Sequence, residues 1–395
     1  RLAVVGVGGR GGGNLGGVQS QDLIALCDID KGRLRSALNQ MRPKHADIRG
    51  YADFREMIAK EKLDGIVVST ADHTHAVISA AGLHAGLDVY CEKPLAHTVG
   101  EARFLTDLAA KKGAVTQMGI QIHAGRNYRR VVEHIRSEVI GKVDQVHVFC
   151  NKTWSGGDRP KGSLPVPDSI DWDLWLGPAP VRPYNKGYHP AHWRRFWDFG
   201  GGTLGDMACH YMDLPFWALK LGHPETVQSD GPRIHPETTP PDLRVQYRFG
   251  ARGDLPGVDL TWYDGKRKPA ILEDLGLAAW KNGVLFVGTK GWLIADYGRM
   301  QVGPQDEFGD YTPPKPFIPD SIGHHKEWIE ACKTRGPTTC AFSYSGPLSE
   351  AVLLGNVSYR LAGKKLDWDP VALRATNCPE AEGFIHKRLR EGWTL

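Results

Sequence analysis

Short apolar runs alternate with amphipathic stretches over the first 120 residues of the chain. The apolar runs, each interpreted as a strand, are Leu2–Val5, Leu23–Cys27, Ile66–Val68, Asp88–Cys91 and Ala114–Met118. Between them, His75–Gly86 is rich in Ala and Leu, and Thr98 with Glu101 forms a capping box that begins a helix running to Lys112. Continuously apolar strands of this length are typical of a parallel sheet buried on both faces. The pattern predicts a doubly wound α/β domain.

The pattern changes after residue 121. Residues 151–200 are rich in Pro, Gly, Trp and Asp and have little periodicity, which predicts a long functional loop. The elements expected around this loop are a helix over 125–137, strands over 143–149, 243–249, 257–263, 283–288 and 292–296, and a helix over 348–362. Asn282-Gly283 and Lys290-Gly291 are turn signals of the kind that join antiparallel strands. The second part of the chain is therefore expected to be α+β, with a large open, mostly antiparallel sheet.

Composition limits the classes of function. The 395 residues include 49 Lys and Arg against 45 Asp and Glu, a net charge of +4 that does not favour nucleic acid as a partner. No stretch reaches the roughly 20 apolar residues that a membrane span requires. The seven cysteines form no C-x-x-C pair, so a disulfide framework is not expected.

A glycine-rich motif follows the first strand directly. In Gly6-Val7-Gly8-Gly9-Arg10-Gly11, the first glycine allows a tight turn, Gly8 lets a pyrophosphate approach the backbone, and Gly11 permits close packing. The N–H groups at the start of the following helix can bind the anion. A glycine turn without a ligand is the alternative. The motif predicts a Rossmann domain over residues 1–121 that binds a dinucleotide, followed by a substrate-binding α+β domain over 122–395.

Asp28 ends the second apolar run, 22 residues after Gly6. An acid at this place binds the adenosine ribose hydroxyls and repels a 2′-phosphate. NAD is therefore favoured over NADP, although Lys31 and Arg33 close by weaken that preference.

Two further motifs carry candidate chemistry. Lys93 follows the fourth strand, at the carboxyl ends of the strands, where open α/β sheets bind ligands. It can therefore hold a substrate hydroxyl or move a proton. If the segment after Gly202 is helical, Asp206 and His210 share one face, as a general acid or base with its orienting carboxylate would. A surface lysine and a satisfied histidine on a capped helix are the structural alternatives. A metal held by His189, His192 and His210 lacks a supporting motif, and no metal is expected.

Together these residues resemble the glucose–fructose oxidoreductase, inositol dehydrogenase and rhizopine-catabolism (Gfo/Idh/MocA) family, and its bacterial members in particular. The segments that carry the resemblance are Gly6–Gly11, Asp28, Val67–Asp72 with His75, Glu92-Lys93-Pro94, Asp206–His210, Leu348–Ala351 and Asp367–Asp369. The resemblance implies a nicotinamide cofactor and a sugar or cyclitol substrate. It makes His210 the base, Lys93 the donor to the substrate oxygen, and Asp206 a bridge between the two.

The same resemblance assigns binding residues. The cofactor-binding residues expected are Gly6, Gly8, Gly9, Arg10, Gly11, Asp28, Ser69, Thr70, His75, Glu92, Lys93 and Gln121. Gln121 matches a position near the nicotinamide, but Ile120 stands where the family commonly has Asn, which puts a contact there in doubt.

Substrate identity is expected to depend on the loop from Trp154 to Trp197, because aromatic faces stack on sugar rings and Arg or His bonds hydroxyls. The substrate-binding residues expected are Lys93, Trp154, Tyr188, His189, Arg194, Asp206 and His210. About half of the loop's Trp residues are expected to pack into the core instead.

The sequence favours an NAD-dependent oxidoreductase that removes a hydride from a ring hydroxyl of a sugar, glycoside or cyclitol. The alternative is an NAD-dependent glycosidase that works by transient oxidation, elimination, hydration and re-reduction, for which Tyr188, His189 and His192 offer extra acids and bases. A cofactor-binding protein without catalysis is a further alternative, and intact Lys93, Asp206 and His210 argue against it.

The sequence gives less direct information on the assembly of the protein and on its cellular compartment. An open antiparallel sheet often buries its face in a second subunit, and relatives of this kind form dimers or tetramers, so a homo-oligomer is expected. The sequence starts at Arg1, within a strand-like run, which leaves two compartments open. A removed twin-arginine leader would place the protein in the periplasm, and otherwise it is cytoplasmic.

Overall fold

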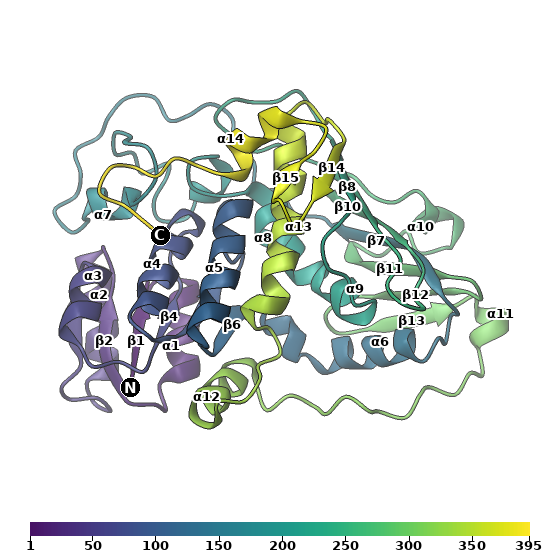
Figure 1. Ribbon diagram of the computed structural model, residues 1–395, viewed down its shortest axis with the longest axis horizontal. Helices are drawn as coiled ribbons and strands as arrows, with labels where there is room; N and C mark the ends of the chain where they lie inside the picture. The colour runs from purple at the N-terminus through teal and green to yellow at the C-terminus, as the bar shows by residue number, and fades with distance from the viewer.

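Two sheets lie side by side in the computed structural model, which describes residues 1–395 (Figure 1). The first is a six-stranded parallel sheet of order β3-β2-β1-β4-β5-β6. Its strands are β1 (Leu2–Val5), β2 (Leu23–Cys27), β3 (Arg49–Tyr51), β4 (Gly65–Val68), β5 (Asp88–Glu92) and β6 (Thr116–Gly119). Every residue of β1, β4 and β5 is buried, which explains why β1, β4 and the middle of β5 are apolar.

Helices cover both faces of this sheet (Figure 1). Those from the first part of the chain are α1 (Arg10–Val18), α2 (Lys31–Met41), α3 (Phe54–Lys60), α4 (Asp72–His84) and α5 (Val99–Lys112). The capping box of Thr98 and Glu101 is formed at the start of α5. Two helices from the end of the chain return to this layer: α12 (His324–Thr334) packs on α1, and α13 (Phe342–Arg360) packs on α5.

The second sheet has nine strands in the order β13-β12-β11-β7-β10-β9-β8-β14-β15. They are β7 (Val143–Cys150), β8 (Thr226–Asp230), β9 (Arg244–Phe249), β10 (Val258–Asp264), β11 (Asn282–Gly288), β12 (Trp292–Ala295), β13 (Met300–Gly303), β14 (Leu366–Asp369) and β15 (Arg374–Ala375). All pairs are antiparallel except β7 with β10. The predicted fold class, a Rossmann sheet beside a mostly antiparallel one, is confirmed. The boundary between residues 121 and 122 stays a prediction.

The segment between β7 and β8 lies over the junction of the two sheets and supplies the site. It holds α7 (Trp172–Leu176), the 3₁₀ turn η2 (Trp193–Arg195), α8 (Gly202–Tyr211) and α9 (Asp213–Ala218). Its long irregular part is held by a buried aromatic cluster of its own: Trp172, Trp175, Tyr184, Tyr188, Trp193, Phe196 and Phe199. The predicted functional loop is thus a packed structure whose aromatic residues act largely as anchors.

The remaining elements complete the chain. They are η1 (Gln121–Ala124), α6 (Arg126–Arg136), α10 (Ile271–Asp274), α11 (Gln305–Phe308), η3 (Pro379–Ala381) and α14 (Glu382–Ile385). All seven cysteines are free thiols, and no helix is long and apolar enough to cross a membrane.

Two local predictions were wrong. Asn282-Gly283 is not a turn but the beginning of strand β11, which pairs with β7. The last long helix begins at Phe342, six residues before the predicted start, and contains Pro347. Pro347 lies in the second turn, where it removes one intrahelical N–H donor, and burial of Phe342 and Leu348 stabilises the extra turns.

Candidate active site

The turn after β1 requires glycine at three of its positions. Gly6 has φ +81°, and a Cβ there would lie 2.7 Å from the carbonyl oxygen of Ser69. A Cβ on Gly11 would lie only 1.9 Å from the carbonyl oxygen of Gly6. Gly9 faces open space, since no atom lies within 4 Å of the place of its Cβ, but its φ of +53° is one that residues with a side chain rarely adopt. The turn therefore leaves free backbone at the start of α1, where an anion can bind.

Asp28 lies beside this turn at the end of β2. Its Oδ2 accepts a hydrogen bond from the Val7 N–H at 2.9 Å, and its Oδ1 accepts one from the Asp30 N–H at 2.9 Å. Burial raises the pKa of Asp28, and these two backbone donors partly oppose that effect. The carboxylate is thereby fixed in orientation at the mouth of a cavity.

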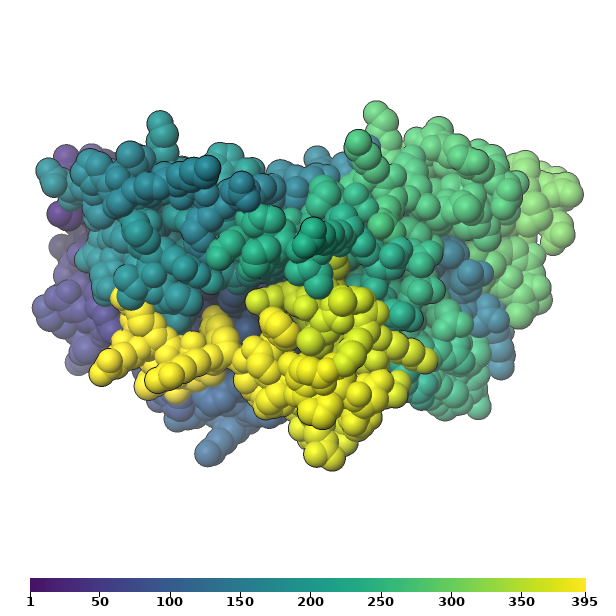
Figure 2. All heavy atoms as spheres, turned by 90° about the horizontal axis from the view of Figure 1, so that it is seen from above, coloured from purple at the N-terminus to yellow at the C-terminus, as the bar shows by residue number.

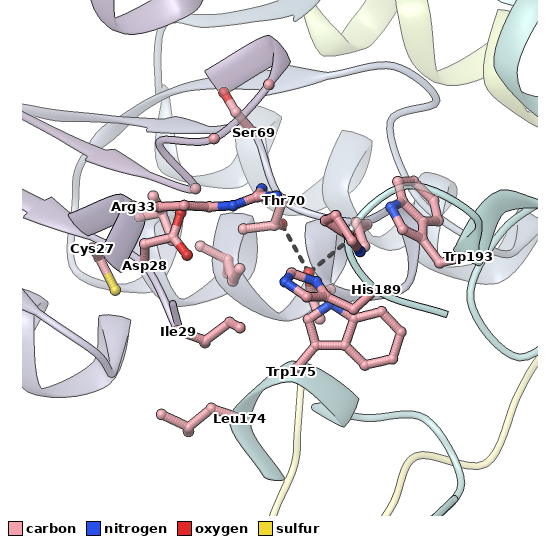
Figure 3. A pocket seen from close by; sticks show the side chains of 18 of the residues that line it. Cys27, Asp28, Ile29, Arg33, Ser69, Thr70, Leu174, Trp175, His189 and Trp193 are labelled. Atoms are coloured by element: carbon pink, nitrogen blue, oxygen red, sulfur yellow. Dashed lines mark hydrogen bonds between the residues drawn. The ribbon is translucent and has the colours of Figure 1, made fainter. Parts of the chain in front are cut away.

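This cavity, which we name the cofactor cavity, has a volume of about 310 Å³ and lies between the glycine turn and the β7–β8 segment. Figure 3 shows Asp28 and Arg33 together on one wall, with Trp175 and His189 across the space from them. The guanidinium of Arg33 lies over Gly8, whose Cβ would stand 2.3 Å from Nη1. The residues fit a dinucleotide: an acid for the ribose hydroxyls, an apolar aromatic wall, and free backbone N–H groups for the pyrophosphate.

A second cavity of about 500 Å³, the catalytic cavity, is lined by the three predicted catalytic residues Lys93, Asp206 and His210. Lys93 and Asp206 meet in it: Nζ donates to Oδ1 at 2.5 Å and to the Asp206 carbonyl oxygen at 2.7 Å. Lys93 follows β5 and Asp206 stands in α8, so the contact joins the two parts of the chain. Both side chains are buried.

Asp206 has two further partners from the β7–β8 segment. The Nε of Arg194 lies 2.8 Å from Oδ1, and Trp154 Nε1–H donates to Oδ2 at 2.6 Å. Burial alone would raise the pKa of Asp206, but Lys93 and Arg194 hold it well below its usual range. Asp206 is therefore an ionised carboxylate that fixes the Lys93 ammonium, the Arg194 guanidinium and the Trp154 indole around one point.

His210 lies one helical turn after Asp206 and lines the same cavity. Neither ring nitrogen has a hydrogen-bond partner, and Nδ1 is shielded from solvent, which leaves Nε2 as the atom open to a ligand. Burial, followed by the nearby Lys93 charge, lowers the pKa of His210 to about 4. The imidazole is thus a neutral, unoccupied proton acceptor. The structure differs here from the expected bridge, because Asp206 bonds to Lys93 and not to His210.

A polar network joins the two cavities. Glu92 is buried, and its Oε1 accepts from Arg10, Asn14 and Gln121. Asn14 also donates to the Ser69 hydroxyl at 2.8 Å. Burial would raise the pKa of Glu92, but Arg10 and these donors lower it overall. The network fixes the loops that follow β1, β4 and β6 relative to one another.

His75 connects two of these loops through backbone carbonyls. Its Nδ1 lies 2.8 Å from the Pro94 carbonyl oxygen and its Nε2 lies 3.1 Å from that of Thr70. Burial opposes a charge on the ring, but Cys91, Asp72 and the Pro94 carbonyl raise its pKa to about 9. A ring that donates from both nitrogens holds the Lys93 loop against the loop after β4.

The structure brings together most of the predicted site residues. Those that line the cofactor cavity are Gly6, Gly8, Gly9, Arg10, Asp28, Ser69, Thr70, His189 and Arg194. Those that line the catalytic cavity are Arg10, Ser69, Thr70, His75, Glu92, Lys93, Gln121, Arg194, Asp206 and His210. Arg10, Ser69, Thr70 and Arg194 belong to both, so the two spaces adjoin.

Three residues of the predicted loop lie elsewhere. Tyr188 is buried in the aromatic cluster, and its hydroxyl accepts from Arg159 at 3.0 Å. His189 faces Asp30 in the cofactor cavity, and burial lowers its pKa to about 4. His192 is exposed and bonds to Arg195. None of the three reaches the catalytic cavity.

Sequence reasoning missed three residues at this site. Asn14 carries the network between α1, Ser69 and Glu92. Tyr297, in the turn after β12, lines the catalytic cavity and stacks on Tyr211 with ring centroids 4.7 Å apart. Asp72 is buried at the start of α4, 3.8 Å from Arg194, and its carboxylate oxygens have no hydrogen-bond partner. Asn14 is marked as a polar residue among the Gly, Leu and Val residues of α1. Asp72 begins α4 beside the polar residues His73, Thr74 and His75, so nothing local marked it or Tyr297.

Comparison with known proteins places the chain. Residues 1–120 match the oxidoreductase family's NAD-binding Rossmann fold, and residues 135–256 match its C-terminal alpha/beta domain. The chain belongs to the Gfo/Idh/MocA oxidoreductase family. Its first domain is the NAD-binding Rossmann fold of that family, and NAD is its cofactor. The resemblance seen in the sequence is confirmed.

Curated relatives match over part of their length. The chain is 31% identical over 155 residues to inositol 2-dehydrogenase 1 of Saccharopolyspora erythraea, covering 38% of this chain and 44% of the relative. It is 28% identical over 152 residues to inositol 2-dehydrogenase of Salmonella typhimurium, covering 37% and 44%. The matched region thus spans less than half the length of these relatives.

Solved structures share the fold over nearly the whole chain. The WlbA dehydrogenase of Bordetella pertussis, in complex with NADH and UDP-GlcNAcA, has a TM-score of 0.66 at 16% identity and covers 93% of this chain and 98% of its own. The aldose–aldose oxidoreductase of Caulobacter crescentus, complexed with glycerol, has a TM-score of 0.65 at 17% identity and covers 93% and 99%. Both structures share the fold of this chain, including its two sheets.

Proposed function

We propose that this protein oxidises a ring hydroxyl of a sugar, glycoside or cyclitol and uses NAD as the oxidant. The observation that carries the proposal is the contact of Lys93 with Asp206 beside a free His210, in a cavity that adjoins the cofactor cavity. A hydroxyl bound there can meet a proton acceptor and a hydrogen-bond donor while it lies next to the cofactor.

Lys93 fixes the substrate oxygen. An ammonium has three N–H donors, and Asp206 takes two of them through Oδ1 and its carbonyl oxygen. The third donor remains for the oxygen that changes from hydroxyl to ketone. Because Asp206 fixes the direction of the other two, the third is also fixed, which favours one orientation of the sugar.

His210 takes the hydroxyl proton. Its imidazole is neutral because burial lowers its pKa to about 4, and Nε2 is free to accept. NAD held in the cofactor cavity would supply the acceptor for the hydride of the ring carbon, and the loss of that hydride with the hydroxyl proton would give a ketone. Lys93 donates to the substrate oxygen throughout the reaction and so holds it in place.

The β7–β8 segment contributes recognition. Trp154 has 38% of its surface exposed while its indole N–H is held by Asp206, so its ring can stack on a sugar. Arg194 is partly buried between Asp72 and Asp206 and lines both cavities. We propose these two residues as the substrate-binding part of the loop, with Arg194 next to cofactor and substrate alike.

The experiment is a screen of cyclitols, aldoses and glycosides with NAD, followed by NADH absorbance at 340 nm. The wild-type protein should reduce NAD with at least one of these classes, and Lys93→Met should not. His192→Gln is a matched control, because this histidine is exposed and outside the cavity. Equal reduction of NAD by wild type and Lys93→Met would overturn the proposed role of the cavity.

A second candidate function is an NAD-dependent glycosidase. Such a reaction needs one more base for a ring C–H proton and an acid for the departing oxygen. Tyr297 adds a hydroxyl group to the catalytic cavity, which favours this candidate, and burial raises the pKa of that hydroxyl, so it stays protonated and can act only as the acid. A Shewanella protein named glycosyl hydrolase family 109 protein 1 is 28% identical over 151 residues, covering 36% of this chain and 33% of that protein.

Aryl glycosides separate the two candidates. A dehydrogenase forms NADH and releases no phenol. A glycosidase releases phenol without net NADH and introduces solvent deuterium into the sugar. If Tyr297 serves as the extra group, Tyr297→Phe should lose phenol release and retain NAD reduction of a simple sugar.

We propose in addition that the chain forms a homo-oligomer through its open sheet. The outward positions of β8, β9 and β10 are exposed and polar, and they include the Arg248–Asp259 ion pair of 3.0 Å. Native mass spectrometry would show a dimer or tetramer, and a monomer at micromolar concentration would contradict this proposal.

A further inference from the structure

A third cavity, of about 280 Å³, lies on the other side of the segment that leads into α8. Its walls come from that segment, the start of α5, the end of α13, and residues 383–388 near the end of the chain. Figure 2 shows this last segment, in yellow, running alongside the β7–β8 segment, in teal. The cavity shares no lining residue with the cofactor or catalytic cavity, so it is a separate space.

The third cavity contains an arginine, Arg360, that has no anionic partner in the protein. Its guanidinium lies 4.3 Å from the ring centroid of Phe384 and 5.1 Å from that of Trp197, and it is only partly exposed. It forms no ion pair and no hydrogen bond with the protein. Burial lowers the pKa of Arg360 to about 10, and the distant Asp198 opposes this only in part. A cation removed from water without an anion is costly unless a ligand supplies one.

The acids of the cavity are already paired. Asp198 bonds to Arg159 and Arg182, and Glu237 bonds to Arg159. Lys387, a further cation of the lining, bonds to Glu101 at 2.7 Å. Arg388 lines the cavity, is exposed, and has no ion pair or hydrogen bond. Two guanidinium groups, those of Arg360 and Arg388, are therefore left without an acidic partner.

We propose that this cavity binds a small oxyanion, the carboxylate or phosphate group of a metabolite, with Arg360 as its main contact and Arg388 at its rim. Contact with the two aromatic rings restricts the Arg360 guanidinium, whose N–H groups match the two oxygens of a carboxylate or phosphate. The volume of about 280 Å³ admits a molecule of about the size of citrate.

The cavity is connected to the active site through a segment that contributes residues to both. Asn356 of α13 lines the cavity and donates to the Gly201 carbonyl oxygen at 3.0 Å, directly before α8. Trp197 and Asp198 belong to the same segment as Arg194. An anion bound here lies against the residues that position Arg194 and the start of the helix of Asp206 and His210.

Isothermal titration calorimetry tests the proposal. Phosphate or citrate is added to protein saturated with NAD, because bound NAD occupies the part of the cofactor cavity that could otherwise bind the added anion. Glycerol serves as the neutral control. One anion per chain should bind, and the stronger of the two probes shows whether phosphate or carboxylate is preferred. Failure of both probes to bind, or binding that NAD abolishes, would overturn the proposal.

Variants locate the site. Arg360→Gln should weaken the anion at least tenfold, as expected for a lost hydrogen bond between charged groups, and Arg388→Gln should weaken it several-fold. Arg299→Gln is the matched control, because Arg299 also lies over a tryptophan, Trp280, at 3.9 Å but far from this lining. If Arg360→Gln does not fold, Arg360→Lys and the exposed Arg388 provide the test. Unchanged affinity in the Arg388 and folded Arg360 variants refutes the site.

Discussion

Lys93 and Asp206 stand 113 positions apart in the chain, and the distance from Nζ to Oδ1 is 2.5 Å. Lys93 follows a strand of the Rossmann sheet, and Asp206 lies in α8, between strands β7 and β8 of the second sheet. The contact therefore depends on how the two sheets pack. It directs the remaining N–H of Lys93 toward the space beside His210, where the proposed reaction takes place.

Lys93 and Asp206 should act as one unit in catalysis. Lys93→Met and Asp206→Asn should each lower kcat by about 100-fold or more, because each removes the oriented donor to the substrate oxygen. The double variant should be no slower than the slower single variant, since the same interaction is lost only once. Steady-state kinetics measures this cycle, with Lys60→Met as an exposed control. Additive losses would show that the two residues act separately.

His210 should be needed for turnover and not for cofactor binding. His210→Ala should lower kcat by a factor of about 10² to 10⁴, the usual loss when a general base is removed. The Kd for NAD, measured by fluorescence quenching, should stay within about twofold, because His210 lines the catalytic cavity and not the cofactor cavity. Turnover at the wild-type rate would mean that another group is the base.

The acid limb of the pH profile should report the lowered pKa of His210. The base acts when neutral, and burial beside Lys93 places its pKa at about 4, below the ordinary 6.5. Activity should therefore persist as the pH falls through 6.5 and be lost only as it approaches 4. The measurement is kcat/KM against pH, with folding followed by circular dichroism at each point. An acid limb centred near 6.5 would contradict a neutral, desolvated His210.

Asp28 should determine the choice of cofactor. Its carboxylate is fixed by the backbone of Val7 and Asp30, so it presents a negative charge to the ribose. NAD should bind more tightly than NADP, and Asp28→Ala should narrow the difference by about 1–2 kcal/mol. Asp28→Asn keeps the size of the side chain and much of its hydrogen bonding, so this variant tests the effect of the negative charge apart from that of packing. Titration of both cofactors checks this, and tighter binding of NADP to the wild-type protein would refute it.

A buried pair behind the site should stabilise the fold. Asp213 accepts from His123 Nδ1 at 2.9 Å and from the Tyr344 hydroxyl at 2.7 Å, and it thus joins η1, α9 and α13. Asp213→Asn should lower the free energy of unfolding by about 2–4 kcal/mol, because buried donors lose their charged acceptor. The exposed Asp230→Asn should cost less than about 1 kcal/mol. Urea denaturation measures both, and equal small effects would show that the buried pair is energetically neutral.

The sequence by itself determined the features that depend on neighbouring residues. The glycine turn, the capping box at Thr98, the apolar strands and the shared helix of Asp206 and His210 all arise from hydrogen bonds and periodicity within one segment. These local patterns predicted the fold class, the family and the cofactor. Short polar strands such as β3 and β8 were missed because alternation over so few residues gives little signal.

Only the tertiary structure decided which side chains meet. It joined Lys93 to Asp206, buried Tyr188 in an aromatic cluster, turned His189 toward the cofactor cavity and brought Tyr297 from a distant hairpin beside His210. The spacing of residues along the chain has no bearing on such contacts, because sheet order and helix packing determine which segments adjoin. The same packing set the pKa of His210, since desolvation by surrounding elements is its largest cause.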